Sequence, residues 1–248
     1  MKINIAALIA LLLTLNGFSQ QGYVQYVNPF IGTGGHGHTY PGATVPHGMV
    51  QLSPDTRLTG WDGCGGYHYS DSFIYGFSHT HLSGTGVSDY GDILLMPMNG
   101  QPSHDNKIYG SAFSHAQEKA TAGYYSVKLL DDGIQAEFTA TERAGMHHYT
   151  FSSATDNAII LDLVHRDEVL ESYMTIVDSV TITGLRRSKS WASNQYVYFV
   201  MKFSSPFVKS GIWKDEVPDE KSRYASSKHL KAYMSFNLPA SSDVYVKV

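Results

Sequence analysis

The sequence is short of cysteine and of charge. Cys64 is the only cysteine in 248 residues, so a disulfide within one chain is excluded. Charged residues make up 16% of the chain, against about 25% in an average soluble protein. The formal net charge is −4, and no long basic run occurs. These absences argue against nucleic acid as a partner.

Long apolar runs are also missing. The run at residues 5–13 is too short for a bilayer, which takes about 20 residues. Lys2 precedes it, and the small residues Gly17 and Ser19 follow at the spacing of a cleavage site. We therefore interpret residues 1–19 as a secretory signal peptide rather than a core helix. No cysteine lies beside the cleavage site, so we expect a periplasmic or secreted protein without a lipid or membrane anchor.

Residues 28–92 contain no glutamate and no lysine, yet they hold 14 of the 23 glycines and six of the 12 histidines. Glycine costs about 1 kcal/mol per helix position relative to alanine. This stretch is therefore expected to form short strands joined by long loops rather than helices.

From about residue 123 the pattern changes to alternating apolar and polar residues separated by turn residues. No segment keeps a helical period for long, and residues 224–231 are expected to form one short helix at most. We predict an all-β fold, a large, supersandwich-like β-sandwich with long glycine- and histidine-rich loops. The expected strands, of which the first two form a hairpin, are 124–130, 134–141, 146–151, 158–164, 175–183, 196–203, 231–236 and 243–248.

The last expected strand is still alternating where the sequence stops. Val244, Val246 and Val248 share one face of it. We therefore expect the chain to be a fragment of a longer protein.

Two histidine pairs with one residue between them are candidates for metal binding. The pairs are His36 with His38 and His79 with His81. With Asp89 as a further ligand, they could form a zinc site. The alternative, which we favour, is that these histidines hold glycine-rich backbone by hydrogen bonds, because no further ligand is fixed by spacing.

Trp61 is the candidate for sugar binding, since it lies among glycines at residues 60–66 and has little local packing. A flat aromatic face beside short polar groups such as Asp62 suits a pyranose ring. The alternative interpretation is an indole that plugs one end of the sandwich.

The carboxylates do not identify a catalytic pair. Glycosidases typically use two, an acid and a base or nucleophile. No glutamate occurs before Glu118, and nothing in the spacing singles out one of the early aspartates. Asp62 and Asp71 suit turns equally well. The early aspartates are Asp55, Asp62, Asp71, Asp89 and Asp92.

Three ordered motifs resemble the opening of glycoside hydrolase family 92. The first is VNPFIGTG at residues 27–34 with HGHTYPGA at 36–43. The second is GWDGCGGYHY at residues 60–69. The third is YGFSHTHLSGTG at residues 75–86 with DYGD at 89–92. The later strands match only at the level of pattern.

The resemblance implies a calcium-dependent, exo-acting α-mannosidase that inverts the anomeric centre. It implies an N-terminal β-sandwich, a C-terminal (α/α)6 barrel and a mannose pocket between them, with the calcium ligands and the catalytic carboxylates mainly in the barrel. By the same resemblance Trp61 contacts sugar, with Asp62 and Cys64 as lesser candidates.

We therefore expect residues 20–248 to be the N-terminal β-sandwich domain of a secreted mannosidase, truncated before its barrel. We expect this chain to hold no catalytic residue and no metal ligand. The expected substrates are mannose-terminated glycans with α-1,2 linkages. The alternatives are a stand-alone carbohydrate-binding or vestigial domain, and a zinc hydrolase built on the histidine pairs.

Overall fold

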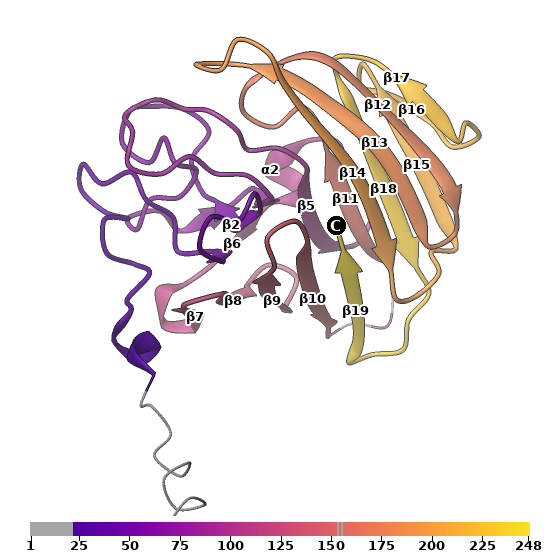
Figure 1. The fold of residues 1–248 in the computed structure, drawn as a ribbon. Coiled ribbons are helices and arrows are strands. Elements are labelled where there is room, and N and C mark those ends of the chain that lie inside the picture. The colour runs from indigo at the N-terminus through magenta and orange to yellow at the C-terminus, as the bar shows by residue number, and fades with distance from the viewer. Residues whose placement is uncertain (1–21, 153, 155) are drawn as a thin grey trace, which may run out of the picture.

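Two large antiparallel sheets make up the computed structural model (Figure 1), which describes residues 22–152, 154 and 156–248. The signal peptide predicted for residues 1–19 lies outside this range. Within it, no helix is long and apolar enough to cross a membrane. The all-β sandwich expected from the sequence is confirmed.

One sheet has eight strands in the order β1-β2-β4-β5-β11-β18-β15-β16, and the other has nine in the order β17-β12-β13-β14-β19-β10-β9-β8-β7. β3 and β6 pair separately. The strands are β1 Ala43–Thr44, β2 Gln51–Asp55, β3 Phe73–Ile74, β4 Gly76–Ser78, β5 Leu94–Asn99, β6 Ser111–Ala112, β7 Glu118–Thr121, β8 Tyr124–Leu129, β9 Ile134–Ala140, β10 Gly145–Phe151, β11 Asn157–Asp162, β12 Glu168–Asp178, β13 Thr181–Lys189, β14 Gln195–Phe203, β15 Lys209–Lys214, β16 Val217–Asp219, β17 Tyr224–Ser226, β18 Leu230–Phe236 and β19 Ser242–Lys247. The helical elements are η1 Tyr23–Tyr26, α2 Asn106–Tyr109 and η2 His115–Gln117.

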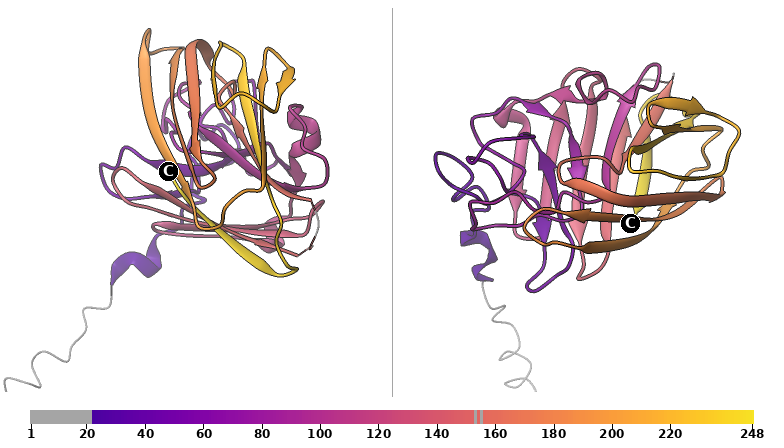
Figure 2. Two further views of the ribbon diagram at one scale, coloured as in Figure 1. Left: turned by 90° about the vertical axis from the view of Figure 1, so that its right-hand side faces the viewer. Right: turned by 90° about the horizontal axis from the view of Figure 1, so that it is seen from above.

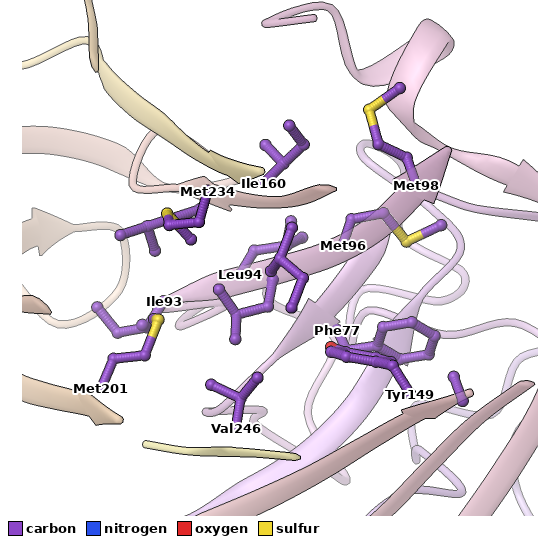
Figure 3. Close-up of a cluster of buried hydrophobic side chains, with 14 of the residues drawn as sticks. Phe77, Ile93, Leu94, Met96, Met98, Tyr149, Ile160, Met201, Met234 and Val246 are labelled. Carbon is purple, nitrogen blue, oxygen red and sulfur yellow. The ribbon is translucent and has the colours of Figure 1, made fainter. Parts of the chain in front are cut away.

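The core lies between the two sheets. In β9, β10 and β19 buried residues alternate with more exposed ones, because only one face of these strands meets the core. β11 is buried along its whole length and pairs with β5 and β18. Figure 3 shows Leu94 and Met234 of one sheet facing Met201 and Val246 of the other.

The strand predicted for residues 175–183 is wrong. The chain turns after Asp178, and β12 and β13 form a long hairpin instead. The Asp178 carboxylate accepts a hydrogen bond of 2.8 Å from the Val180 backbone N–H. Aspartate stabilises a tight turn in this way, and the turn contains neither glycine nor proline that would have marked it.

The short helix allowed for residues 224–231 is also wrong. Tyr224–Ser226 forms β17, which pairs with β12, and β18 begins at Leu230. The hairpin predicted for strands 124–130 and 134–141 is confirmed. It turns at Asp131-Asp132-Gly133, with Leu129 opposite Ile134.

The glycine-rich stretch forms loops with only four short strands, β1 to β4. Figure 1 shows these loops, in indigo and purple, gathered on one side of the sandwich. The nine-stranded sheet bends where β14 meets β19, since these strands share only two residue pairs (Figure 2).

A chain of three buried polar side chains crosses the core. The ring of His79 donates from Nδ1 to the carbonyl oxygen of Ile93 at 2.6 Å, which leaves Nε2 as an acceptor. That nitrogen lies 2.9 Å from Nε2 of His147, whose Nδ1 lies 2.7 Å from the hydroxyl of Tyr149. The chain cannot form when both imidazoles carry a second proton, because the two facing Nε2 atoms would then both be donors. Burial accordingly lowers the pKa of His79 to about 4 and holds the pKa of His147 well below its usual range.

We expect the free energy of unfolding to fall as the pH drops from about 6.5 towards 4. Both histidines take up a proton on unfolding in this window, because their pKa values are higher in the unfolded chain. Each contributes a slope of at most about 1.4 kcal/mol per pH unit. Urea unfolding at several pH values measures this slope. The double substitution His79→Gln and His147→Gln should flatten it, and an unchanged slope would contradict the assignment.

Candidate functional site

The three glycine-rich motifs meet at one end of the domain. Residues 32–43, 60–69 and 75–92 are called the motif loops below. The first is joined to the third by a hydrogen bond of 2.8 Å from the Gly84 N–H to the His38 carbonyl, and to the second by one of the same length from the Tyr69 N–H to the Thr33 carbonyl. Segments far apart in the sequence therefore form one surface.

Trp61 lies on this surface with 58% of its area exposed. The His38 ring stands edge-on to the indole, with centroids 4.4 Å apart. A Cβ at Gly86 would lie 2.4 Å from the indole nitrogen, so glycine there lets the backbone support the ring closely. The exposed indole does not fit the interpretation that Trp61 plugs one end of the sandwich.

Asp62 lies beside Trp61 and accepts a hydrogen bond from Nδ1 of His36 at 2.9 Å. This hydrogen bond lowers the pKa of the Asp62 carboxyl. The carboxylate is therefore held in place while part of it stays open to solvent.

Cys64 lies behind this surface. Its thiol is buried and donates to the Thr85 carbonyl at 3.0 Å. Burial raises the pKa of the thiol, which keeps it in the hydrogen-bonding, uncharged form. Of the three predicted site residues, Trp61 and Asp62 face solvent, and Cys64 joins the second motif loop to the third.

Arg166 supports the loops from beneath. One guanidinium nitrogen donates to the Cys64 carbonyl and, at 2.6 Å, to the Ser88 hydroxyl. Another lies 3.5 Å from the Asp55 carboxylate. A single buried cation thus connects the second motif loop, the third motif loop and β2.

Asp55 is fully buried and surrounded by cationic or donating groups. Ser78 donates to it at 2.5 Å, and the rings of His81 and His165 lie 3.2 Å and 3.4 Å away. Burial alone would raise the pKa of this carboxyl, but the two histidines outweigh burial and hold it well below its usual range. A Cβ at Gly66 would lie 2.4 Å from the same carboxylate, which explains the need for glycine.

Arg186 forms a second buried ion pair, with Asp92 at the end of the third motif loop. Both side chains are completely buried. The guanidinium also donates to the backbone carbonyls of Leu163, His165 and Asp167, at 3.1, 2.7 and 3.1 Å. The other oxygen of Asp92 accepts from Thr80 at 2.7 Å and from Gln195 at 2.6 Å.

Asp167 is a carboxyl near the motif loops whose pKa is raised rather than lowered. Burial, together with the neighbouring carboxyl of Asp89, raises the pKa of Asp167 to about 7, although Arg186 opposes the shift. Asp89 in turn accepts from the backbone N–H of Ala192 at 3.0 Å. The raised pKa favours the protonated form of Asp167.

Sequence reasoning missed Arg166, Asp167 and Arg186. A signal for the first two existed, because His165-Arg166-Asp167 follows directly on the predicted strand 158–164. Charged residues at the end of a buried strand commonly face a site. Arg186 lies within β13 and gave no such signal. Asp71, for which sequence reasoning left a catalytic role and a turn role equally open, accepts from Arg57 at 2.6 Å and from Thr56 at 2.9 Å.

The histidine pairs do not come together. His79 bonds to the Ile93 carbonyl and to His147, whereas His81 bonds to the Gln51 carbonyl at 2.7 Å and faces Asp55. These contacts agree with the interpretation that His79 and His81 hold backbone. The ring of His36 instead bonds to the Asp62 carboxylate, and that of His38 contacts Trp61. Among residues 22–152, 154 and 156–248, no group of three or more histidine, cysteine or acidic side chains is placed to hold a metal ion.

Comparisons with known proteins place this sandwich and its motif loops among glycoside hydrolases. Residues 26–248 match the family model described as "Glycosyl hydrolase family 92 N-terminal domain". The chain belongs to this family, and it corresponds to the N-terminal domain.

Solved structures of the family share the fold. An α-mannosidase of family GH92 from Bacteroides thetaiotaomicron, in complex with mannoimidazole, is 36% identical, with a TM-score of 0.86 over 92% of this chain and 32% of that one. An inverting mannosidase of the family from the same species is 30% identical, with a TM-score of 0.81 over 92% of this chain and 31% of that one.

A curated relative from the fungus Arthroderma benhamiae is described as an uncharacterized secreted glycosidase. It is 33% identical over 172 residues, which are 64% of this chain and 22% of the relative. The chain thus covers 32% of the length of the mannoimidazole-bound neighbour and 22% of the length of the fungal relative.

We expect Arg186→Ala to lower the free energy of unfolding by about 3–5 kcal/mol, because it leaves the Asp92 carboxylate buried without its partner. Arg187→Ala is the matched control. Arg187 lies on the partly exposed face of the same strand, where it pairs with Glu171 and covers the ring of Tyr196. Its loss should cost about 1 kcal/mol or less. Urea unfolding of the two variants measures the difference, and equal losses would refute this role of Arg186.

Proposed function

We propose that this chain is the N-terminal domain of a secreted, calcium-dependent, exo-acting α-mannosidase that inverts the anomeric configuration. The proposed substrates are glycans that end in α-1,2-linked mannose. The observation that carries the proposal is the 36% identity, over 92% of the chain, to an α-mannosidase whose structure contains mannoimidazole. The presence of an inverting mannosidase among the neighbours supports the stereochemistry.

In this proposal the motif loops form one wall of the mannose pocket. The exposed face of Trp61 packs against the C–H groups of the sugar ring, and Asp62, oriented by His36, accepts a hydrogen bond from a hydroxyl group. The backbone at Gly86 lies against the indole, since a Cβ there would be 2.4 Å from the indole nitrogen.

The acid, the base and most calcium ligands belong, in this proposal, to a C-terminal domain that this sequence does not include. Inversion requires one carboxyl group to protonate the leaving oxygen and a second to activate water. Calcium, when bound, would polarise sugar hydroxyls. The described part of this chain contributes binding and orientation to that reaction.

The domain alone is expected not to hydrolyse α-mannosides. The test begins by reading the coding sequence beyond Val248. Residues 20–248 and the longer gene product are then expressed, and both are assayed on an aryl α-mannoside. The longer protein should turn over substrate with calcium and lose activity with a calcium chelator. A stop codon directly after Val248 would instead favour a stand-alone carbohydrate-binding domain. Calcium-dependent turnover by residues 20–248, abolished by one Asp→Asn change, would contradict the division of labour.

Trp61→Ala in the longer protein should lower kcat/KM by roughly 5- to 150-fold. Loss of an indole face against the sugar removes an apolar contact of about 1–3 kcal/mol, and 1.4 kcal/mol corresponds to a factor of ten. The melting temperature should change little, because more than half of the side chain is exposed. Trp61→Phe, which keeps an aromatic face, should recover part of the activity. Unchanged kinetics in a folded Trp61→Ala protein would remove Trp61 from the site.

A further inference from the structure

β14 has an unpaired edge over most of its length. On one side, residues from Gln195 to Lys202 pair continuously with β13. On the other side, only Lys202 and Phe203 pair with β19. The strands separate from there, which leaves the edge of β14 towards Gln195 without a partner among the described residues. An open edge of this length is a template for another strand.

The backbone groups that face this edge can be identified. The Phe203 N–H donates to the Val180 carbonyl, on the β13 side, at 2.9 Å. The Ser204 N–H donates to the Tyr245 carbonyl, on the β19 side, also at 2.9 Å. Because directions alternate along a strand, the N–H and C=O groups of Val200, Tyr198 and Tyr196 face the open edge.

A groove runs along this edge, with a volume of about 490 Å³. Its lining includes Val197 to Val200 of β14, together with Met49, Ala144 and Val248. Exposed apolar side chains surround it, since Tyr198 is 65% and Val200 54% exposed. Large apolar side chains beside an open strand edge favour a protein segment as the occupant.

The charges that line the groove indicate what kind of segment can occupy it. The charged residues that line the groove are Arg143, Lys202 and Lys247, and no carboxylate lies among them. The groove therefore suits an extended segment with apolar residues that is neutral or acidic overall.

The pairing register of β19 with β14 places an extension of β19 along the same edge. β19 runs antiparallel to β14, with Lys202 opposite Lys247. Extended in this register, the first residue after Val248 lies opposite Val200, and the third lies opposite Tyr198. Figure 1 places the C-terminus at the tip of β19, beside β14.

β10 cannot pair with such an extension. Val248 and Gly145 exchange backbone hydrogen bonds of 2.9 and 3.0 Å. Before Gly145 the chain turns back towards β9, with the Thr141 N–H bonded to the Ala144 carbonyl at 2.8 Å. Among the residues that the structure describes, the open edge of β14 is then the strand edge left for an extension beyond Val248.

We propose that the residues following Val248 in the longer protein extend β19 as a strand along the open edge of β14. They close the sheet and fill the groove with an alternating apolar segment. This inference rests on the proposed function in one respect, because that function requires polypeptide beyond Val248. The junction then fixes where the next domain begins relative to the motif loops.

Amide hydrogen exchange at single-residue resolution tests the proposal on residues 20–248 and on the longer gene product. The amides of Tyr196, Tyr198 and Val200 should exchange at least about tenfold more slowly in the longer protein. Those of Val197, Phe199 and Met201 point towards β13 and serve as internal references, slow in both proteins. Equally fast exchange at the three edge amides in both proteins would overturn the inference.

Tyr198→Pro and Tyr198→Thr form a matched pair for the same measurement. Proline removes an edge N–H without removing a bond to β13, whereas threonine removes the ring and keeps the N–H. Proline should restore fast exchange at Tyr196 and Val200 in the longer protein, and threonine should leave both amides slow. An equal effect of the two substitutions would show that the ring, not the backbone edge, mediates the contact, and would reject the proposed strand.

Two further outcomes separate the alternatives. Protection of the edge that rises with protein concentration in residues 20–248, and not with chain length, would assign the edge to a second copy and overturn the inference. Activity of the longer protein on the aryl α-mannoside reports separately on the proposed function. Activity without edge protection rejects only the inference, and edge protection without activity rejects only the proposed function.

Discussion

The buried ion pair between Arg186 and Asp92 holds the motif loops to the sheet. A loop region with few regular hydrogen bonds has little apolar surface of its own to bury, so other forces must fix its position. Arg186 places a cation in the core, where desolvation is costly unless every donor finds a partner. Asp92 and three backbone carbonyls supply those partners. The pair and its ligands therefore specify one arrangement of the third motif loop.

Arg166 and Asp55 support the motif loops in the same way, closer to the surface. Arg166 holds the backbone of Cys64 from below, and Asp55 lies against Gly66, so the second motif loop is supported on its inner side. The outer side of the loop is then free to present Trp61. The polar chain through His79 gives the adjacent core a similar, uncharged support.

Much of the fold follows from sequence pattern, because alternation and turn residues determine strands locally. The hairpin at Asp131-Asp132-Gly133 is an example, and the resemblance of the motif loops identified the family. The hairpin at Asp178 was missed because its turn is stabilised by a side chain, with no glycine to mark it. Arg186 was missed for a different reason. Its partner Asp92 is 94 residues away, and an arginine within a strand pattern is normally interpreted as facing solvent.

The composition of the motif region also affects how susceptible the folded domain is to proteases. Between residues 28 and 92 there is no lysine, and Arg57 is the single arginine. Its guanidinium is bound by Asp71, with 28% of the side chain exposed. Proteases of trypsin-like specificity cut after lysine or arginine, so this whole irregular stretch offers them one bond, next to a side chain that is already engaged. Long loops, which are normally the preferred sites of proteolytic cleavage, are in this domain chemically poor targets for that class of enzyme.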